Sequence, residues 1–132
     1  MEFTSAFLVD QDIAIRVSTR YVERQSNPDA STYTFAYTIT IRNDSEATVQ
    51  LLARHWDILD GYGGSRTVTG EGVVGQKPVL APGESYTYTS GCSFECPVGR
   101  MSGHYVFYNL DTRTKFRVRI PAFMMTFPPH LN

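Results

Sequence analysis

The feature that most limits the fold of this chain is an unbroken alternation of apolar and polar residues from position 33 to position 42. Apolar residues stand at the odd positions, and Thr, Ala and Arg stand at the even ones. A spacing of two puts one set of side chains on one face of a β-strand, whereas a helix buries a face at a spacing of three to four. The segment therefore predicts a strand whose core-facing residues are Tyr33, Phe35, Tyr37, Ile39 and Ile41.

Other segments share this period and are separated by turn residues. We expect strands at 13–22, 49–59, 86–89, 104–110 and 114–120, an edge segment at 65–75, and a long loop at 91–103. Within 49–59, Val49 and Leu51 are out of phase with Trp56 and Ile58, which predicts a bulge or burial on both faces. About seven strands and no capped helical pattern predict an all-β fold, a two-sheet sandwich of the immunoglobulin or fibronectin III kind.

Length and charge narrow the class of protein. The 132 residues suit a single domain, 1–132, and 12 Lys and Arg against 13 Asp and Glu argue against a nucleic-acid partner. No apolar run is long enough to span a bilayer, so we expect no membrane partner. We identify no signal peptide, and Cys92 and Cys96 are too few for a disulfide framework. These features predict a cytoplasmic protein.

A literal G-x-G-x-x-G pattern occurs at Gly70, Gly72 and Gly75. In a dinucleotide fold such glycines lie between a strand and a helix, but here Pro78 follows and no helical pattern does. We therefore expect a bent edge strand, no tight nucleotide binding and no cofactor. Exposed N–H groups near Arg66 and Lys77 leave open a binding loop for small anions.

Catalytic and metal-binding patterns are weak. Cys92 and Cys96 offer two thiols where a structural zinc site needs four ligands, so no metal site is predicted. The chain has no G-x-S-x-G or H-E-x-x-H motif. On a strand His55 and Asp57 share a face and Trp56 points the other way, but no nucleophile accompanies them. We expect no catalytic residues and no enzymatic activity.

Several short motifs together resemble the bacterial ApaG family over nearly the whole chain. They are 39–43 (ITIRN), 50–56 (QLLARHW), 70–75 (GEGVVG), 80–84 (LAPGE), 88–91 (YTSG) and 120–123 (IPAF). The resemblance implies a fibronectin-like β-sandwich, a genomic association with diadenosine-tetraphosphate hydrolase and a link to magnesium and cobalt homeostasis. Related domains occur in eukaryotic adaptor proteins, which implies protein binding.

The sequence and the resemblance together predict a non-enzymatic protein-interaction module whose partner is not identified. The expected surface combines the loop from Gly70 to Gly75 with His55, Trp56 and Tyr62. The alternative is a small-anion binding protein that holds phosphate or pyrophosphate groups on the glycine-rich loop, with Arg66 and Lys77 as the cations.

Overall fold

Nine β-strands make up most of the chain that the structure describes, residues 3–61 and 63–127 of a computed structural model. The strands are β1 (Phe3–Asp10), β2 (Ile13–Tyr21), β3 (Tyr33–Asn43), β4 (Val49–Asp60), β5 (Gly64–Glu71), β6 (Val79–Leu80), β7 (Ser85–Phe94), β8 (Val98–Asn109) and β9 (Thr114–Thr126). Two single-turn 3-10 helices, η1 (Glu23–Gln25) and η2 (Pro28–Ala30), lie between β2 and β3. No helix among the described residues is long and apolar enough to cross a membrane.

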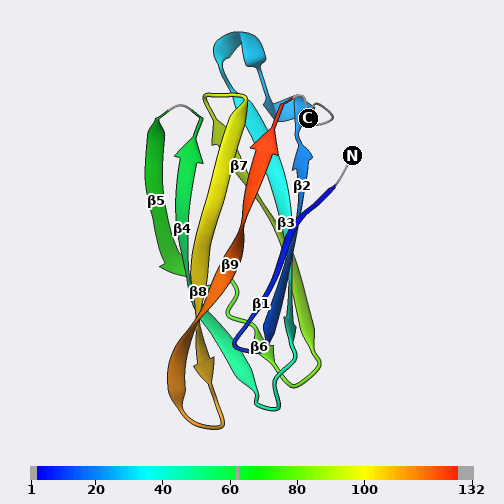
Figure 1. The fold of residues 1–132 in the computed structure, drawn as a ribbon, viewed down its shortest axis with the longest axis vertical. Coiled ribbons are helices and arrows are strands. Elements are labelled where there is room, and N and C mark those ends of the chain that lie inside the picture. The colour runs from blue at the N-terminus through cyan, green and yellow to red at the C-terminus, as the bar shows by residue number, and fades with distance from the viewer. Residues whose placement is uncertain (1–2, 62, 128–132) are drawn as a thin grey trace.

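The strands form two antiparallel sheets that pack face to face (Figure 1). One sheet has the order β1-β2-β3-β7. The other has the order β5-β4-β8-β9, with β6 paired to the start of β4. This confirms the predicted all-β, two-sheet sandwich, and it is consistent with a fibronectin-like fold.

The alternation that predicted β3 also builds the core. Phe35, Tyr37, Ile39 and Ile41 are all at most 5% exposed, and Tyr33 at the strand end is half-buried. Opposite them, in β9, Val118 and Ile120 are buried and Phe116 packs against the same cluster. Burying one face of each sheet against the other removes these side chains from water, which is the main stabilising term of such a fold.

The conflicting phases of β4 are resolved by a bulge. The pairing of β4 with β8 shifts register between Leu51 and Ala53, so that an extra residue enters β4. Val49 and Leu51 before the shift and Trp56 and Ile58 after it are therefore all buried on the same side. Of the two expected explanations, a bulge or burial on both faces, the structure shows the bulge.

The predicted loop at 91–103 is wrong, because β7 runs to Phe94 and β8 begins at Val98. The tight turn between them is held by Asp60, whose carboxylate accepts the backbone N–H groups of Glu95 at 2.9 Å and Cys96 at 3.1 Å. Gly99 and Gly103, which suggested a loop, are sites of close packing. A Cβ at Gly99 would overlap the Phe94 ring, and one at Gly103 would overlap the His55 carbonyl.

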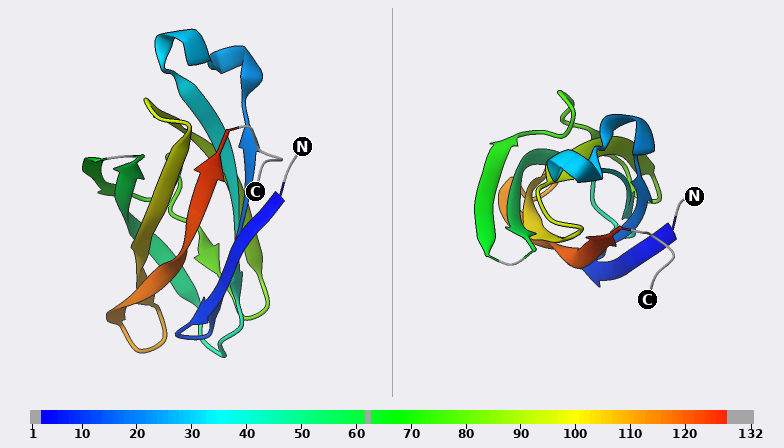
Figure 2. Two further views of the ribbon diagram at one scale, coloured as in Figure 1. Left: turned by 45° about the horizontal axis from the view of Figure 1, so that its top comes forward. Right: turned by 90° about the horizontal axis from the view of Figure 1, so that it is seen from above.

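The two long sides of the sandwich differ. On one side β1 lies beside β9, as seen from above in Figure 2. There the Asp10 carboxylate accepts the Arg119 backbone N–H at 2.9 Å and lies 3.3 Å from Arg119 Nε. On the other side the sheets end in β5 and β7, which are not hydrogen-bonded neighbours. The sandwich is closed on the first side and open on the second.

Truncation of the β3 core residues tests the predicted phase. We expect Phe35→Ala or Ile39→Ala to lower the free energy of unfolding by about 2–5 kcal/mol, because each leaves a cavity in a packed core. Lys115→Ala, at an exposed position of β9, serves as the control and should change stability by less than about 0.5 kcal/mol. Denaturant unfolding measures all three, and similar values for core and control variants would refute the assignment.

The contact that closes the β1–β9 side should depend on pH. The Arg119 backbone N–H, opposed in part by burial and assisted by the guanidinium, holds the pKa of Asp10 below its ordinary value. The stabilisation is therefore present above the unfolded-state pKa of about 3.9 and is lost as the pH falls through the folded-state pKa. We expect Asp10→Asn to be less stable than the wild type at pH 7. That difference should shrink below about pH 4, and one that is constant with pH would contradict this account.

Candidate functional site

A groove of about 370 Å³ runs along the open side of the sandwich. Its floor is the margin of the core, formed by the buried residues Trp56, Ile58 and Met101. Its walls come from the edge strands, with Val68 on β5 and the segment 90–93 on β7. The groove is therefore apolar at its base and bordered by the backbone of two edge strands.

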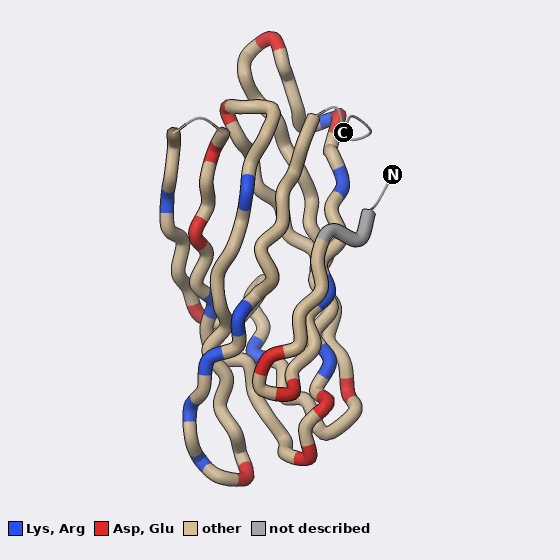
Figure 3. Tube along the Cα trace, in the orientation of Figure 1, with Lys and Arg blue, Asp and Glu red and all other residues tan. Residues whose placement is uncertain are grey.

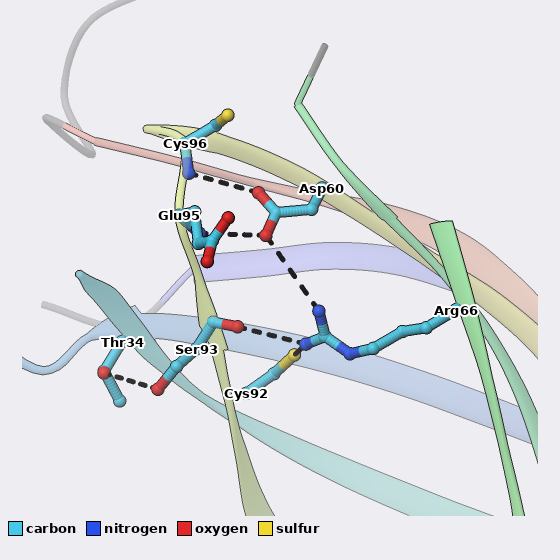
Figure 4. A network of polar contacts seen from close by, with 7 residues as sticks. All are labelled: Thr34, Asp60, Arg66, Cys92, Ser93, Glu95 and Cys96. Atoms are coloured by element: carbon cyan, nitrogen blue, oxygen red, sulfur yellow. Dashed lines mark hydrogen bonds and ion pairs between the residues drawn. The ribbon is translucent and has the colours of Figure 1, made fainter. Parts of the chain in front are cut away.

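Arg66 connects the two edges at one end of this groove (Figure 4). From β5, its Nη2 donates to the Ser93 carbonyl on β7 at 3.0 Å and lies 3.3 Å from the Cys92 sulfur. Its Nη1 is 4.0 Å from the carboxylate of Asp60, the group that also holds the β7–β8 turn. Beyond Arg66 lies a second hollow of about 330 Å³ that includes Asp60 and Glu95. We name the contact of Arg66 with Ser93, Cys92 and Asp60 the Arg66 bridge.

The Arg66 bridge affects the Cys92 thiol in two opposing ways. Burial raises the pKa of Cys92, and the positive charge of Arg66 lowers it, with burial the larger effect. Cys92 is therefore held as a neutral thiol at neutral pH, which is a poor nucleophile and a poor metal ligand. Both cysteines are free. Across the described ranges, no three His, Cys, Asp or Glu side chains are arranged to hold a metal ion.

Arg54 lies in the groove on the inner face of β4. It is in phase with Trp56 and Ile58, which are buried. Its Nη1 donates to the carbonyls of Glu71 at 2.9 Å and Gly72 at 3.0 Å, where the chain leaves β5. Arg54 was not predicted as a site residue, although its position two residues before Trp56 places a cation on the apolar phase of a strand.

The glycine-rich loop is explained by local packing. A Cβ at Gly70 would lie 2.8 Å from Arg54 Nη2. Gly72 has a φ of +60°, and its Cβ would overlap the Gln76 carbonyl. Gly75 has a φ of +75° and follows Val74 at +46°, and the N–H groups of Val73 and Gln76 each donate to the other's carbonyl in a tight hairpin. Two consecutive residues with positive φ are typical of a type I′ turn.

The structure does not bring the expected cations together on this loop. Lys77 forms an ion pair with Glu71 at 2.7 Å, and Arg66 extends in the other direction, to β7. The backbone N–H of Gly72 donates to Leu52 and that of Val73 to Gln76. Those donors are therefore already satisfied within the protein.

The predicted interaction residues on β4 lie on opposite faces. Trp56 is 3% exposed and reaches the surface only as the floor of the groove. His55 lies on the outer face, where its Nε2 is 3.1 Å from an Asp57 carboxylate oxygen and its ring stacks on His104 at 4.7 Å. Burial and the nearby charges of Arg117 and His55 lower the pKa of His104. Tyr62 lies outside the described residues.

Comparison with known proteins decides the family. Residues 23–109 match the model of the ApaG domain, DUF525. The chain belongs to the ApaG family. It is 48% identical to Protein ApaG of Vibrio campbellii over 120 residues, which are 91% of this chain and 94% of that protein. It is also 48% identical to Protein ApaG of Escherichia coli K12 over 116 residues, 88% of this chain and 92% of that protein.

A solved structure supports the ApaG fold. A crystal structure described as that of the ApaA protein of Bordetella pertussis superposes with a TM-score of 0.85 at 40% identity, covering 95% of this chain and 98% of that one. The resemblance to the ApaG family that the sequence motifs suggested is thereby confirmed.

Nucleotide binding can be tested directly on this ApaG protein. We expect ATP, NAD and diadenosine tetraphosphate to show no saturable binding in the micromolar range. A micromolar complex requires about 8 kcal/mol. The exposed Lys77, already paired with Glu71, would add at most about 1 kcal/mol. Isothermal titration at physiological salt is the measurement. A saturable heat near 10 µM that disappears in Lys77→Ala would overturn the expectation.

Proposed function

We propose that this ApaG-family protein is a non-enzymatic cytoplasmic module that binds an extended segment of a partner protein along the edge of β7. In this mode a peptide adds a strand to a sheet, so that main-chain hydrogen bonds give affinity and pockets for alternate side chains give specificity. The observation that carries the proposal is the open side of the sandwich, where the edge of β7 pairs with no further strand and borders a groove with an apolar base.

The backbone of β7 is oriented for such pairing. The Ser93 carbonyl points away from β3, since it accepts the Arg66 guanidinium from across the groove. In an antiparallel strand the backbone groups of alternate residues point the same way. Gly91, Thr89 and Thr87 therefore direct their N–H and C=O groups toward the open side. In an antiparallel sheet, opposite residues that exchange no backbone hydrogen bonds have the closer side chains. The side-chain hydrogen bond between Thr87 and Thr40, at 3.0 Å, fits such a pair, in which the backbone groups of Thr87 point away from β3.

β7 also lacks the sequence features that usually keep the edge of a strand from pairing with another strand. Such edges are usually protected by Pro, by charged residues, by bulges or by short length. The ten residues of β7 contain no Pro and no charged side chain, and their pairing with β3 continues without a register shift. An edge of this kind is suited to receive a strand.

The groove supplies places for the partner's side chains. Side chains of a strand added to β7 alternate between the two faces, so every second one would point into the groove over Trp56, Ile58 and Met101. The link to magnesium and cobalt homeostasis that the family resemblance implies is proposed to act through this partner.

Selection of peptides from a random phage-displayed library against the whole protein tests the proposal. We expect selected peptides to slow amide hydrogen exchange in β7. Thr89→Pro removes an outward N–H without touching the β3 ladder, so peptide affinity should fall at least about tenfold, or about 1.4 kcal/mol. Thr89→Ala keeps that N–H and is the matched control, which should bind as the wild type does.

Two results would refute this mode of binding. One is protection of amides on an element other than β7. The other is equal peptide affinity in Thr89→Pro and Thr89→Ala, with both variants shown to be folded by their thermal unfolding.

A further inference from the structure

We propose that Arg54 is a carboxylate-binding residue of the groove, and that the partner segment places an Asp or Glu side chain or its C-terminal carboxylate against this guanidinium. The inference rests on the proposed function for its biological meaning. It deepens that function by naming the chemistry that the groove recognises, and it can be tested without a peptide.

Arg54 is a cation on the inner face of the sandwich. It is half-buried, and it lines the groove together with Tyr37 and the β7 residues Ser90 and Gly91. Its charge acts on the tyrosines of the inner face. Burial raises the pKa of Tyr37, and the positive charge of Arg54 opposes that shift. The guanidinium therefore lies at the margin of the core, at the place where the sandwich opens.

This cation has no carboxylate partner in the described part of the chain. The ion pairs there join Arg42 to Asp44, His55 to Asp57, Arg66 to Asp60, Lys77 to Glu71 and Arg119 to Asp10. Glu71 contacts Arg54 only through its backbone carbonyl, because its carboxylate is paired with Lys77. A charge partly removed from water is stabilised by an opposite charge, so this position favours an anion in the groove.

The hydrogen bonds of Arg54 leave donors for a ligand. A guanidinium has five N–H donors, and both hydrogen bonds of Arg54, to Glu71 and Gly72, start from Nη1. Gly70 provides the space, since any Cβ there would lie 2.8–2.9 Å from the guanidinium atoms. The edge formed by Nε and Nη2 matches a carboxylate, which accepts two parallel N–H bonds. Arg66 differs, because both of its terminal nitrogens are already engaged within the Arg66 bridge, by Ser93, Cys92 and Asp60.

The surroundings favour a carboxylate over a phosphate. The groove has an apolar floor. The other cation of the groove, Arg66, already forms an ion pair with Asp60. One free guanidinium balances the single charge of a carboxylate, whereas a phosphate group near neutral pH carries about −1.5 to −2. Gly91 and Arg54 line the same groove, so a strand added beside Gly91 would direct its inward side chains into the groove that contains Arg54.

Titration of the full chain with sodium acetate tests the proposal by NMR at pH 7, with sodium chloride adjusted to keep the ionic strength constant. We expect a saturable shift of the Arg54 Nε–Hε signal and of the Ser90 and Gly91 amides. Arg54→Gln should weaken acetate binding at least about tenfold, the loss expected when a charged hydrogen-bonding group is removed. Arg42→Gln is the control, because Arg42 lies on the outer surface in an ion pair with Asp44, and it should leave the acetate response unchanged.

A second variant keeps the arginine and moves it. Gly70→Ala puts a Cβ against the flexible end of Arg54, so the chain should remain folded while the guanidinium leaves its place. We expect this variant to lose acetate binding as Arg54→Gln does. N-acetylglycine, which carries only a terminal carboxylate, and N-acetylaspartate α-amide, which carries only a side-chain carboxylate, are added separately to distinguish the two.

The outcomes separate this inference from the proposed function. A non-saturable shift at Arg54, or acetate binding that survives both variants, would overturn the role of Arg54 even if peptides bind to β7. Saturable acetate binding that depends on Arg54, with no peptide protecting β7, would support the carboxylate site and refute the strand-addition mode.

Discussion

The burial of alternate side chains between two antiparallel sheets is the interaction on which the rest of this structure depends. It requires each strand to keep its phase, and β4 does so only because the bulge after Leu51 brings Trp56 and Ile58 onto the buried face. It also leaves each sheet with two edges. The edges β1 and β9 lie together, joined by Asp10 and Arg119, whereas β5 and β7 do not pair. The contact between β1 and β9 closes one side of the sandwich, and the remaining two edges, β5 and β7, form the open side.

The open side allows polar groups to occupy inner positions that a closed sandwich would exclude. Arg54 and Arg66 both project from the inner faces, yet each finds hydrogen bonds at the margin of the core. Arg66 on β5 joins the two sheets through its hydrogen bond to the Ser93 carbonyl on β7, and it also lies 4.0 Å from Asp60 of its own sheet. Arg54 keeps a half-buried charge with backbone partners only. Figure 3 shows a row of basic positions along the β8–β9 turn and the first part of β9.

The glycine-rich loop shows how a familiar pattern can arise from packing. Gly70 makes room for Arg54, Gly72 avoids the Gln76 carbonyl, and Gly75 completes a turn of positive φ. Each glycine has a structural cause within the chain, so the spacing does not by itself indicate a phosphate ligand. The same packing places the guanidinium of Arg54 against Gly70.

The sequence by itself determined the all-β class, the phase of β3 and β9 and the resemblance to the family, since period-two patterns and local motifs depend only on neighbouring residues. For β4 it left a bulge and burial on both faces as alternatives, and the register shift after Leu51 decides between them. It did not reveal β1. It also missed the extent of β7 and β8, because Gly99 and Gly103 resemble loop residues until Phe94 and His55 are placed against them. Nor did it group Arg54, Arg66, Asp60 and Ser93. Which edges meet and which remain open is decided by contacts between residues far apart in the chain, and that choice places these side chains along the open side of the sandwich.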